Sequence, residues 1–481
     1  MTKRHIWYAA GAAALSLGFA AGCGTGDDTQ GAGATRSAKP RTSASATSTG
    51  PAYKGAALPA LSRRPAWSLR ADSSTGCAGD PARAAATSTV GDDPETCVLG
   101  DAVVVTQDLT KYPGSSSSGD EPDEYHFRAR LYDAATGGVR ASVDVEIPDS
   151  WPGKREHKPS AFLTVSQWTD GSPALLVVDG DVTEASGLKK ESVETSYTMY
   201  SPSGRKLGSS SFQGAGRTDL TAEAGHVLLD EGSKSSTYAP IGGGDTVPVH
   251  NRAYGQQPIG SGFGYRVATG SDVWDTSGTW LVVSDRLTGK ELWNTKDDVD
   301  VPADIASAND DDAKPVRIYP LSADKALLAW ELSDDDPYDA LLGVVDLKTG
   351  RTLAQGPKVA FGDVAGDDTA DIALSPDGTT VVTRFGGGAV AWNVKTGDEL
   401  WRQEDDEQDI TPLALPSADV LYASVGDMRL AALNMRTKKL LSPDLAPDVS
   451  LAEDGDALQF TTDGYGVLAG QHLFVFAPGS A

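Results

Sequence analysis

Short apolar runs bounded by turn-forming residues recur along most of this chain. Residues 341–345, 389–392 and 428–433 are rich in apolar or β-favouring side chains, and runs of this length and composition are typical of β-strands. Helical periodicity is scarce after the N-terminus. The hydrophobic pattern therefore predicts an all-β domain.

Many of the runs are followed by the same five-residue phrase, Asp/Asn-x-x-Thr-Gly. Its first side-chain oxygen can accept a hydrogen bond from the backbone two residues further on, and its glycine can adopt positive φ without a Cβ clash. Each copy therefore predicts a tight hairpin, and the Asp-Gly pair within residues 374–379 predicts another. Four copies and a fifth that ends in lysine occupy Asp133–Gly137, Asp285–Gly289, Asp346–Gly350, Asn393–Gly397 and Asn434–Lys438.

Three weaker turn signals complete the series, at residues 200–204, 238–242 and 474–479. A repeat of about 40 to 60 residues is typical of the four-stranded blades of a β-propeller. Eight turns across residues 65–481 predict eight blades, and seven blades are the alternative. Because the last turn comes just before the chain ends, the final blade lacks an outer strand. Residues 64–69 fit that place and predict a closed ring.

A longer form of the phrase, Asp/Asn-x-x-Thr-Gly-x-x-Leu-Trp, occurs at Asp285–Trp293 and Asn393–Trp401, and Trp67 supplies the matching tryptophan for the closing strand. This form resembles the pyrroloquinoline-quinone-type repeat of the quinoprotein-like eight-bladed propellers. The resemblance covers residues 65–481 and implies the fold. It leaves the activity open, because that family includes quinone-dependent dehydrogenases, outer-membrane assembly lipoproteins and sensor domains of membrane kinases.

The N-terminus predicts export. A basic start precedes an uncharged run over residues 6–22 and then Cys23, which is typical of a signal peptide and not of a permanent membrane helix. Residues 20–23 are similar to the lipobox of bacterial lipoproteins, in which the cysteine is acylated. We therefore predict a lipoprotein signal peptide at residues 1–22, a lipid on Cys23 and a place on the extracytoplasmic face of the bacterial cell membrane. Ordinary secretion is the alternative.

The next segment predicts a tether. Residues 23–64 are dominated by Gly, Ala, Ser and Thr, a composition with too little apolar surface to order itself. We expect these residues to be disordered and to connect the membrane to a propeller at residues 65–481.

Two cysteines remain once Cys23 is acylated. In an exported chain, Cys77 and Cys97 predict a disulfide, which would stabilise the fold by about 3 kcal/mol. A redox pair is the alternative, but such pairs usually have C-x-x-C spacing.

The chain is strongly acidic, with a formal net charge of −26. Such a surface repels phosphate backbones, so we expect no nucleic-acid partner. Acidic residues cluster at 309–312, 334–336 and 404–407, which we interpret as solvated loops.

Motifs for catalysis are missing. The quinone-dependent members of that family hold the cofactor with two adjacent cysteines, whereas Cys77 and Cys97 are far apart in the chain. The six histidines are scattered without a zinc-binding pair, and His472 is interpreted as a structural imidazole with a satisfied hydrogen bond. We therefore expect no cofactor, no metal and no catalytic residue.

One acidic segment, residues 361–371, resembles the calcium loop of integrin-type propeller repeats, in which carboxylates surround a hard cation. Asp363, Asp367 and Asp371 would be the ligands. Ala365 replaces an expected oxygen ligand. An acidic loop between blades is therefore the favoured interpretation, and a weak calcium site stays open.

The tryptophans divide into two groups. Three follow the repeat and are predicted to lie in the blade cores: Trp293, Trp392 and Trp401. Four others are better candidates for an exposed, sugar-binding face: Trp151, Trp168, Trp274 and Trp280.

These features together predict a non-catalytic binding or scaffold module. Its long insertions at residues 111–124, 179–195 and 300–315 would face a protein or cell-envelope partner. An exported enzyme, quinone-dependent or hydrolytic, with its site on the propeller axis is one alternative. A ligand-sensing module is another.

Overall fold

The chain divides into residues 1–45 and a second, compact unit of residues 46–481. Every residue that the computed structural model describes belongs to the second unit, so the predicted signal peptide and Cys23 lie outside the described part. Within the described part, no helix is both long and apolar enough to cross a membrane. The described residues are 50–80, 95–112, 122–151, 158–186, 188, 190–213, 222–230, 236–248, 257–260, 262–269, 279–299, 316–331, 339–360, 371–386, 388–426, 429–442, 445, 458–470 and 472–479.

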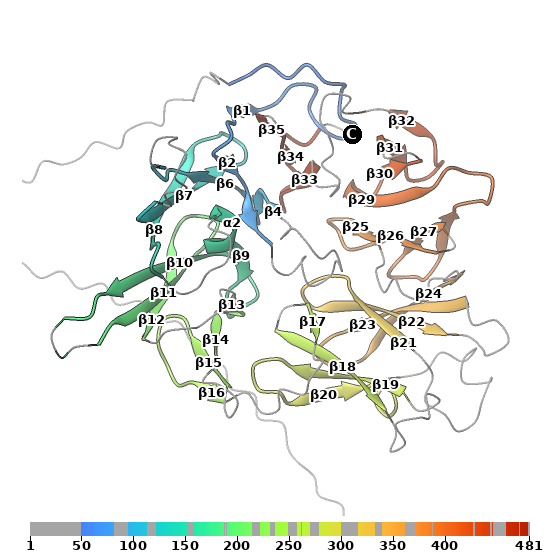
Figure 1. Ribbon diagram of the computed structural model, residues 1–481. Helices are drawn as coiled ribbons and strands as arrows, with labels where there is room; N and C mark the ends of the chain where they lie inside the picture. Colours follow the sequence, from blue (N-terminus) through green and yellow to red (C-terminus); the bar gives the residue numbers. More distant parts are fainter. Residues whose placement is uncertain are drawn as a thin grey trace, which may run out of the picture. The chain divides into compact units, whose positions relative to one another are not determined.

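Residues 46–481 fold into a ring of eight sheets, an eight-bladed β-propeller (Figure 1). Each blade is built on an antiparallel meander that runs from an inner first strand to an outer fourth strand. The predicted all-β class and the count of eight blades are confirmed, and the seven-bladed alternative is wrong. A single turn of helix, α2 (Pro159–Phe162), interrupts the β-structure of the described residues.

The blades are numbered in chain order. Blade 1 holds β2 (Thr75–Gly76), β5 (Val98–Leu99), β6 (Ala102–Asp108), β7 (Glu124–Asp133) and β8 (Val139–Pro148); blade 2 holds β3 (Ala78–Gly79), β4 (Glu95–Thr96), β9 (Leu163–Gln167), β10 (Pro173–Thr183), β11 (Ser192–Tyr200) and β12 (Lys206–Gln213). Blade 3 holds β13 (Ala222–Glu223), β14 (His226–Asp230), β15 (Ser236–Pro240) and β16 (Val247–Pro248); blade 4 holds β17 (Gln257–Ile259), β18 (Phe263–Thr269), β19 (Thr279–Asp285) and β20 (Glu291–Asn294). Blade 5 holds β21 (Val316–Pro320), β22 (Lys325–Glu331), β23 (Asp339–Asp346) and β24 (Thr352–Ala360); blade 6 holds β25 (Asp371–Leu374), β26 (Thr380–Phe385), β27 (Gly388–Asn393) and β28 (Glu399–Arg402). Blade 7 holds β29 (Ile410–Ser417), β30 (Val420–Val425), β31 (Arg429–Asn434) and β32 (Leu440–Ser442); blade 8 holds β33 (Leu458–Phe460), β34 (Gly466–Leu468), β35 (His472–Phe476) and β1 (Trp67–Arg70).

The repeat phrase forms the turn between the third and fourth strands of its blade. In the first copy, Asp133 Oδ1 accepts hydrogen bonds from Thr136 N and Oγ1, both at 2.8 Å, and Gly137 N donates to Asp133 O at 2.8 Å. Gly137 has a φ of 69°, which a Cβ would disfavour. The predicted hairpins are therefore confirmed, although the side-chain bond in this copy comes from three residues along the chain and not two.

Two tryptophans on outer strands, Trp293 of the longer phrase and Trp67 of the closing strand, join neighbouring blades. Trp293 on the outer strand of blade 4 donates from Nε1 to Leu347 O at 2.7 Å, and a Cβ on Gly350 would lie 2.7 Å from the indole ring. Trp67 of blade 8 donates in the same way to Ala134 O at 2.8 Å. Each tryptophan thus docks on the turn of the next blade, where glycine leaves the necessary room.

The junction of blades 6 and 7 departs from this pattern. Lys438 replaces the turn glycine and keeps a positive φ of 53°, and the buried Trp401 Nε1 has no hydrogen-bond partner among the described residues. Lys438 Nζ instead donates to Arg402 O at 2.8 Å and to Glu407 Oε2 at 2.7 Å. An ion pair therefore replaces the indole hydrogen bond at this junction.

The predicted closing strand is confirmed. β1 pairs antiparallel with β35, with Trp67 opposite Val475, so blade 8 contains strands from both ends of the propeller sequence (Figure 1). This pairing supplies the fourth strand of the last blade and closes the ring.

The tether prediction is wrong for residues 50–64, because this stretch packs on blades 7 and 8. Leu58 is 2% exposed and Leu61 is 8% exposed. The ring centroid of Tyr53 lies 5.0 Å from that of Phe476. A few apolar side chains within a polar, small-residue composition are enough to hold the segment on the ring.

The division of the tryptophans is partly wrong. Trp151, predicted to be exposed, is 1% exposed: a Cβ on Gly180 of blade 2 would lie 2.7 Å from its ring, and its Nε1 donates to Thr195 Oγ1 at 3.3 Å. A neighbouring blade covers it.

Trp274 lies outside the described residues. The three predicted core tryptophans are buried as expected: Trp293, Trp392 and Trp401. Two candidates for exposure are half-buried: Trp168 and Trp280.

Candidate binding surface

The strands of each blade alternate in direction, so the two faces of the ring carry different connections. First-to-second and third-to-fourth connections, such as residues 168–172 and 347–351, lie on one side, which we name the turn face. The others join strand ends on the opposite side, the loop face. Between the described strands, turn-face connections span two to six residues, whereas the longest loop-face connections include residues 109–123, 295–315 and 443–457. Recognition is usually carried by long connections of this kind.

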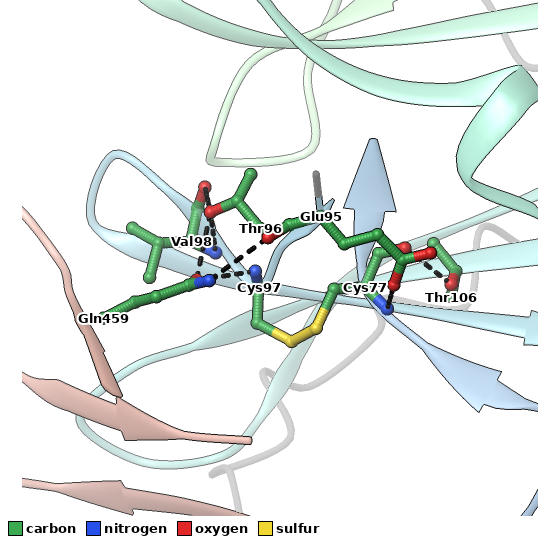
Figure 2. Close-up of a disulfide and its surroundings, with 7 residues drawn as sticks. All are labelled: Cys77, Glu95, Thr96, Cys97, Val98, Thr106 and Gln459. Atoms are coloured by element: carbon green, nitrogen blue, oxygen red, sulfur yellow. Dashed lines mark hydrogen bonds between the residues drawn. A yellow bond between two sulfur atoms is a disulfide. The ribbon is translucent and has the colours of Figure 1, made fainter. Parts of the chain in front are cut away.

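A disulfide segment lies at the inner edge of the ring. Cys77 and Cys97 form a disulfide with their Cα atoms 4.7 Å apart (Figure 2). Beside it, β3 pairs in parallel with β9, and β4 pairs with β3. Because β9 is the inner strand of blade 2, the segment extends that blade toward the propeller axis.

Hydrogen bonds tie the same segment to two further blades. Gln459 of blade 8 accepts at Oε1 from Cys97 N at 2.8 Å and from Thr96 Oγ1 at 3.0 Å. Thr106 of blade 1 donates to Cys77 O at 3.0 Å, as Figure 2 shows. One covalent loop therefore fastens blades 8, 1 and 2 where the ring closes.

A groove of about 470 Å³ lies on blade 1 at the loop-face ends of β6, β7 and β8. Its acidic side chains outnumber its basic ones. The basic side chains are Lys111 and Arg128, and the acidic ones are Asp123, Glu124, Asp144 and Glu146. The groove is therefore an acidic recess on the face with the longer connections.

His126 stands between two of these carboxylates. Its Nε2 lies 3.1 Å from Glu124 Oε2, and its Nδ1 lies 3.6 Å from Glu146 Oε1. Arg128 Nε donates to Asp144 Oδ1 at 2.5 Å, and this bond raises the pKa of the arginine. Since Arg128 is matched by Asp144, Glu124 and Glu146 dominate the charge offered to a ligand.

The long hairpin of blade 2 borders the groove. β10 and β11 stay paired out to Thr183 and Ser192, so the insertion predicted at residues 179–195 is in large part regular strand. Glu146 N donates to Asp179 Oδ1 of this hairpin at 3.3 Å. Figure 1 shows the hairpin reaching away from the ring, and Leu188 beyond its paired part is fully exposed. The groove and the hairpin together form the candidate binding surface.

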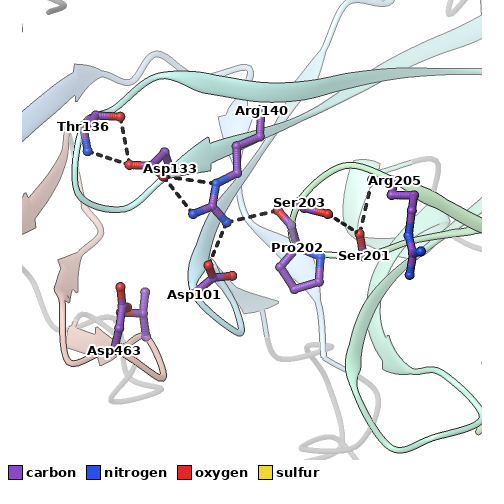
Figure 3. Close-up of polar contacts among 10 residues, drawn as sticks. Asp101, Asp133, Thr136, Arg140, Ser201, Pro202, Ser203, Arg205 and Asp463 are labelled. Atoms are coloured by element: carbon purple, nitrogen blue, oxygen red, sulfur yellow. Dashed lines mark hydrogen bonds and ion pairs between the residues drawn. The ribbon is translucent and has the colours of Figure 1, made fainter. Parts of the chain in front are cut away.

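On the turn face, by contrast, polar side chains form hydrogen bonds and ion pairs that connect neighbouring blades. Arg140 Nη1 lies 3.1 Å from Asp101 Oδ2, its Nη2 lies 2.8 Å from Asp133 Oδ2, and it donates to Pro202 O at 3.3 Å (Figure 3). The hydrogen bond from Arg140 is the main reason that the pKa of Asp133 lies below its usual value. This network joins blades 1 and 2, and Arg140 is fully engaged within it.

The groove offers charge and hydrogen-bond acceptors. Among the described residues, no group of three His, Cys, Asp or Glu side chains is placed to hold a metal. Asp371, the described member of the predicted calcium loop, pairs with Arg384 at 3.4 Å, while Asp363 and Asp367 lie outside the described residues. The arrangement suits a cationic ligand surface.

Sequence reasoning missed this groove and misjudged one histidine. His472 Nδ1 is buried without a hydrogen-bond partner among the described residues, where a satisfied imidazole was predicted. No motif marks the groove, because the charged residues of β7 alternate with buried ones as in any half-buried strand. The only indication of the groove in the sequence is that β7 and β8, which are neighbouring strands, both carry charged residues at their outward-facing positions.

No family model and no curated protein matches this chain. Among solved structures, BamB from Moraxella catarrhalis is similar at 12% identity over 79% of this chain and 90% of that chain, with a TM-score of 0.25. The Dos1 propeller is similar at 10% identity over 80% of this chain and 94% of that chain, with a TM-score of 0.32. Values this low carry no argument about function, which has to come from the residues themselves.

Proposed function

We propose that this chain is a lipid-anchored, extracytoplasmic propeller that binds a protein of the cell envelope and performs no catalysis. The observation that carries the proposal is the acidic groove of blade 1, flanked by the long hairpin of blade 2, on the face with the longer connections. The export signal and Cys23 support the location.

Charge favours a partner with a basic surface. Among the described residues, Glu124 and Glu146 of the groove contact His126 and no lysine or arginine, so their negative charge is available to a partner. The net charge of −26 would also speed the encounter with a cationic protein, because long-range attraction steers association. The exposed Leu188 would add an apolar contact beside the polar groove.

Capture of the partner from crosslinked cell envelope tests the proposal. The lipidated wild-type chain should recover one protein, and the Glu124→Lys/Glu146→Lys variant should recover at least about tenfold less of it, because like charges across an interface repel. Asp245→Lys is the matched control: Asp245 is exposed on the turn face, so its reversal should leave recovery unchanged. Equal recovery by all three chains would exclude the groove as the binding site.

The anchor is tested separately. The wild-type chain should incorporate a labelled fatty acid, whereas Cys23→Ala should not, because its residue 23 has no sulfur to acylate. Label on the Cys23→Ala chain would contradict the proposed anchor without bearing on the groove.

A direct test also addresses the catalytic and sensing alternatives. The purified chain, incubated with pyrroloquinoline quinone and calcium, should show no bound-cofactor absorbance and no dye reduction. A thermal-shift screen should find no small molecule that raises the melting temperature. A reduced dye would favour the quinone-dependent enzyme, and a stabilising small molecule would favour the sensor.

A further inference from the structure

Exposed leucines recur on the outer rim of blades 5 to 7. They lie on the outermost strands β24, β28 and β32, within two residues of the strand ends at the turn face. An apolar side chain exposed at the same place in successive blades indicates a contact surface. The four residues are Leu353, Leu400, Leu440 and Leu441, which are 41%, 48%, 50% and 45% exposed.

The leucines form one strip because each turn leans on the outer strand of the preceding blade. A Cβ on Gly397 of blade 6 would meet Gln355 O of β24. Lys438 Nζ of blade 7 donates to Arg402 O of β28 at 2.8 Å. Gln355 and Arg402 each lie two residues beyond the exposed leucine of their own strand, so the apolar positions of the three blades follow one another along the rim.

Basic side chains border this strip on blades 5 and 7, whereas Asp398 and Glu399 precede Leu400 on blade 6. The turn of blade 5 exposes Lys348 and Arg351, and the turn of blade 7 exposes Arg436 and Lys439. Arg436 is paired with Asp419 at 3.0 Å, and Lys348, Arg351 and Lys439 form no ion pair with another described residue. We name these four basic residues and the four leucines the rim patch.

We infer that the rim patch docks on the surface of an anionic lipid bilayer. Leucine side chains enter the boundary between headgroups and acyl chains, while lysine and arginine meet the anionic headgroups. The two requirements of such a surface, apolar side chains and adjacent cations, coincide on blades 5 and 7. The inference rests on the proposed membrane location and is independent of the groove.

The path of the N-terminal segment supports this orientation. Ser68 Oγ on blade 8 donates to Pro51 O at 2.9 Å, and Tyr422 Oη on blade 7 donates to Pro59 O at 2.5 Å. The segment that leads toward Cys23 therefore runs beside blades 7 and 8, and blade 7 also carries the two leucines of β32. Residues 24–49 are all that separates Cys23 from the described part of the segment.

Docking by the rim patch would give the anchor and the groove different tasks. The patch lies at the turn-face end of the outer strands, so a bilayer that contacts it leaves the strand ends of the loop face pointing away from the lipid. The acidic groove would then face the cell envelope and not the like-charged membrane. The lipid would hold the protein at the bilayer, and the rim patch would set its orientation.

Vesicle binding without the acyl anchor tests the inference. Since residues 46–481 form one compact unit, a chain that starts at residue 24 keeps the fold and lacks Cys23. This chain should sediment with vesicles of phosphatidylglycerol and phosphatidylcholine and bind weakly to phosphatidylcholine alone. Leu440→Ser/Leu441→Ser should lower the partition coefficient by at least about tenfold, and Arg351→Glu/Lys439→Glu should lower it by about fivefold or more per reversed charge.

Matched changes on the hairpin of blade 2 provide the control. Leu188→Ser and Lys190→Glu replace the same residue types at exposed positions beyond the loop-face end, so they should leave vesicle binding unchanged. Equal losses in both sets, or no binding by the parent chain, would overturn the inference. So would a parent chain that dimerises in solution and becomes monomeric in the leucine variant, because the exposed edge strands would then pair with a second copy. None of these results bears on partner capture by the groove.

Discussion

The turn face and the loop face of this ring are built in opposite ways. On the turn face, Thr136 donates to Asp133 within its own turn, and Arg140 donates to the next blade. On the loop face the longest connections are found, and Glu124 and Glu146 line an open groove. Polar groups that are satisfied internally specify the architecture, whereas polar groups left open are available to a partner.

The comparison also shows where the ring depends on its repeat. Blades 4 and 5, and blades 8 and 1, are joined by a tryptophan that docks on the next turn. At the inner edge of the ring, the disulfide segment and Gln459 connect blades 8, 1 and 2 without the repeat phrase. The repeat phrase is therefore a structural device of one face, and its presence in other propellers says little about what the opposite face binds.

The largest effect is expected from removing a docked tryptophan. Trp293 is 1% exposed and its Nε1 donates to Leu347 O, so Trp293→Ala should lower the free energy of unfolding by about 3–5 kcal/mol. Trp401→Ala should cost about 1 kcal/mol less, because Trp401 Nε1 has no partner to lose among the described residues. Urea unfolding of both variants measures the difference. A larger loss for Trp401→Ala would show that the indole hydrogen bond does not hold the turn face together.

The disulfide is the corresponding test for the closure of the ring. The loop between Cys77 and Cys97 has a sequence separation of 20, and Cys77→Ser/Cys97→Ser should lower the free energy of unfolding by about 3 kcal/mol. Wild-type protein unfolded in the presence of a reductant should match the variant. If the variant unfolds at the same urea concentration as the oxidised wild type, the segment does not stabilise the closure.

Substitutions of two glycines distinguish the free-energy cost of backbone strain from the cost of a clash with Trp293. Gly350 has a φ of 70° and a Cβ there would lie 2.7 Å from Trp293, whereas Gly378 has a φ of 65° and no atom within 4 Å of such a Cβ. Gly378→Ala should cost about 1 kcal/mol for the backbone alone, and Gly350→Ala should cost about 2–3 kcal/mol because overlap is added. Equal melting temperatures for the two variants would contradict the docking of Trp293 on the turn.

The features predicted from sequence are those set by local chemistry. The Asp133 and Asp346 turns follow from residues within a few positions of one another and from the positive φ of glycine, and the count of eight blades follows from the recurrence of such turns. The closing strand is predicted because Trp67 matches the tryptophan of the recurring phrase. Because a local signal of this kind recurs along the chain, each further copy supports the prediction made from the others. Periodic local signals are the most readable part of a sequence.

The features that sequence did not reveal depend on contacts between distant segments. Trp151 is buried because Gly180 of the next blade leaves room for it. Residues 50–64 are held by a few apolar side chains within a composition typical of a linker. The groove combines outward charges of two strands, and alternating charged residues are read equally well as an ordinary solvated strand face. Each of these three features is defined by which distant residues lie next to each other in the fold, and not by the types of residue involved.

The smallest effect compares two carboxyl groups whose pKa values move in opposite directions. On the turn face, the hydrogen bond from Arg140 lowers the pKa of Asp133. At the loop-face end of β22, burial raises the pKa of Glu331 by more than Arg317, 3.9 Å away, lowers it. A lowered pKa contributes stability above the unfolded-state value that is lost as the pH falls through the folded value. A raised pKa contributes stability below the unfolded-state value that is lost as the pH rises through the folded value.

Neutralising each group should therefore change stability with opposite signs. Asp133→Asn should lower the free energy of unfolding at neutral pH by less than about 1 kcal/mol, because asparagine can still accept the bond from Thr136, and the loss should vanish in acid. Glu331→Gln should leave stability unchanged or slightly higher at neutral pH, and that gain should vanish in acid because both forms are then uncharged. Urea unfolding at neutral and acid pH measures both. A neutral-pH loss for Glu331→Gln as large as that for Asp133→Asn would show that the carboxylates of both faces serve the fold, and the contrast between the faces would fail.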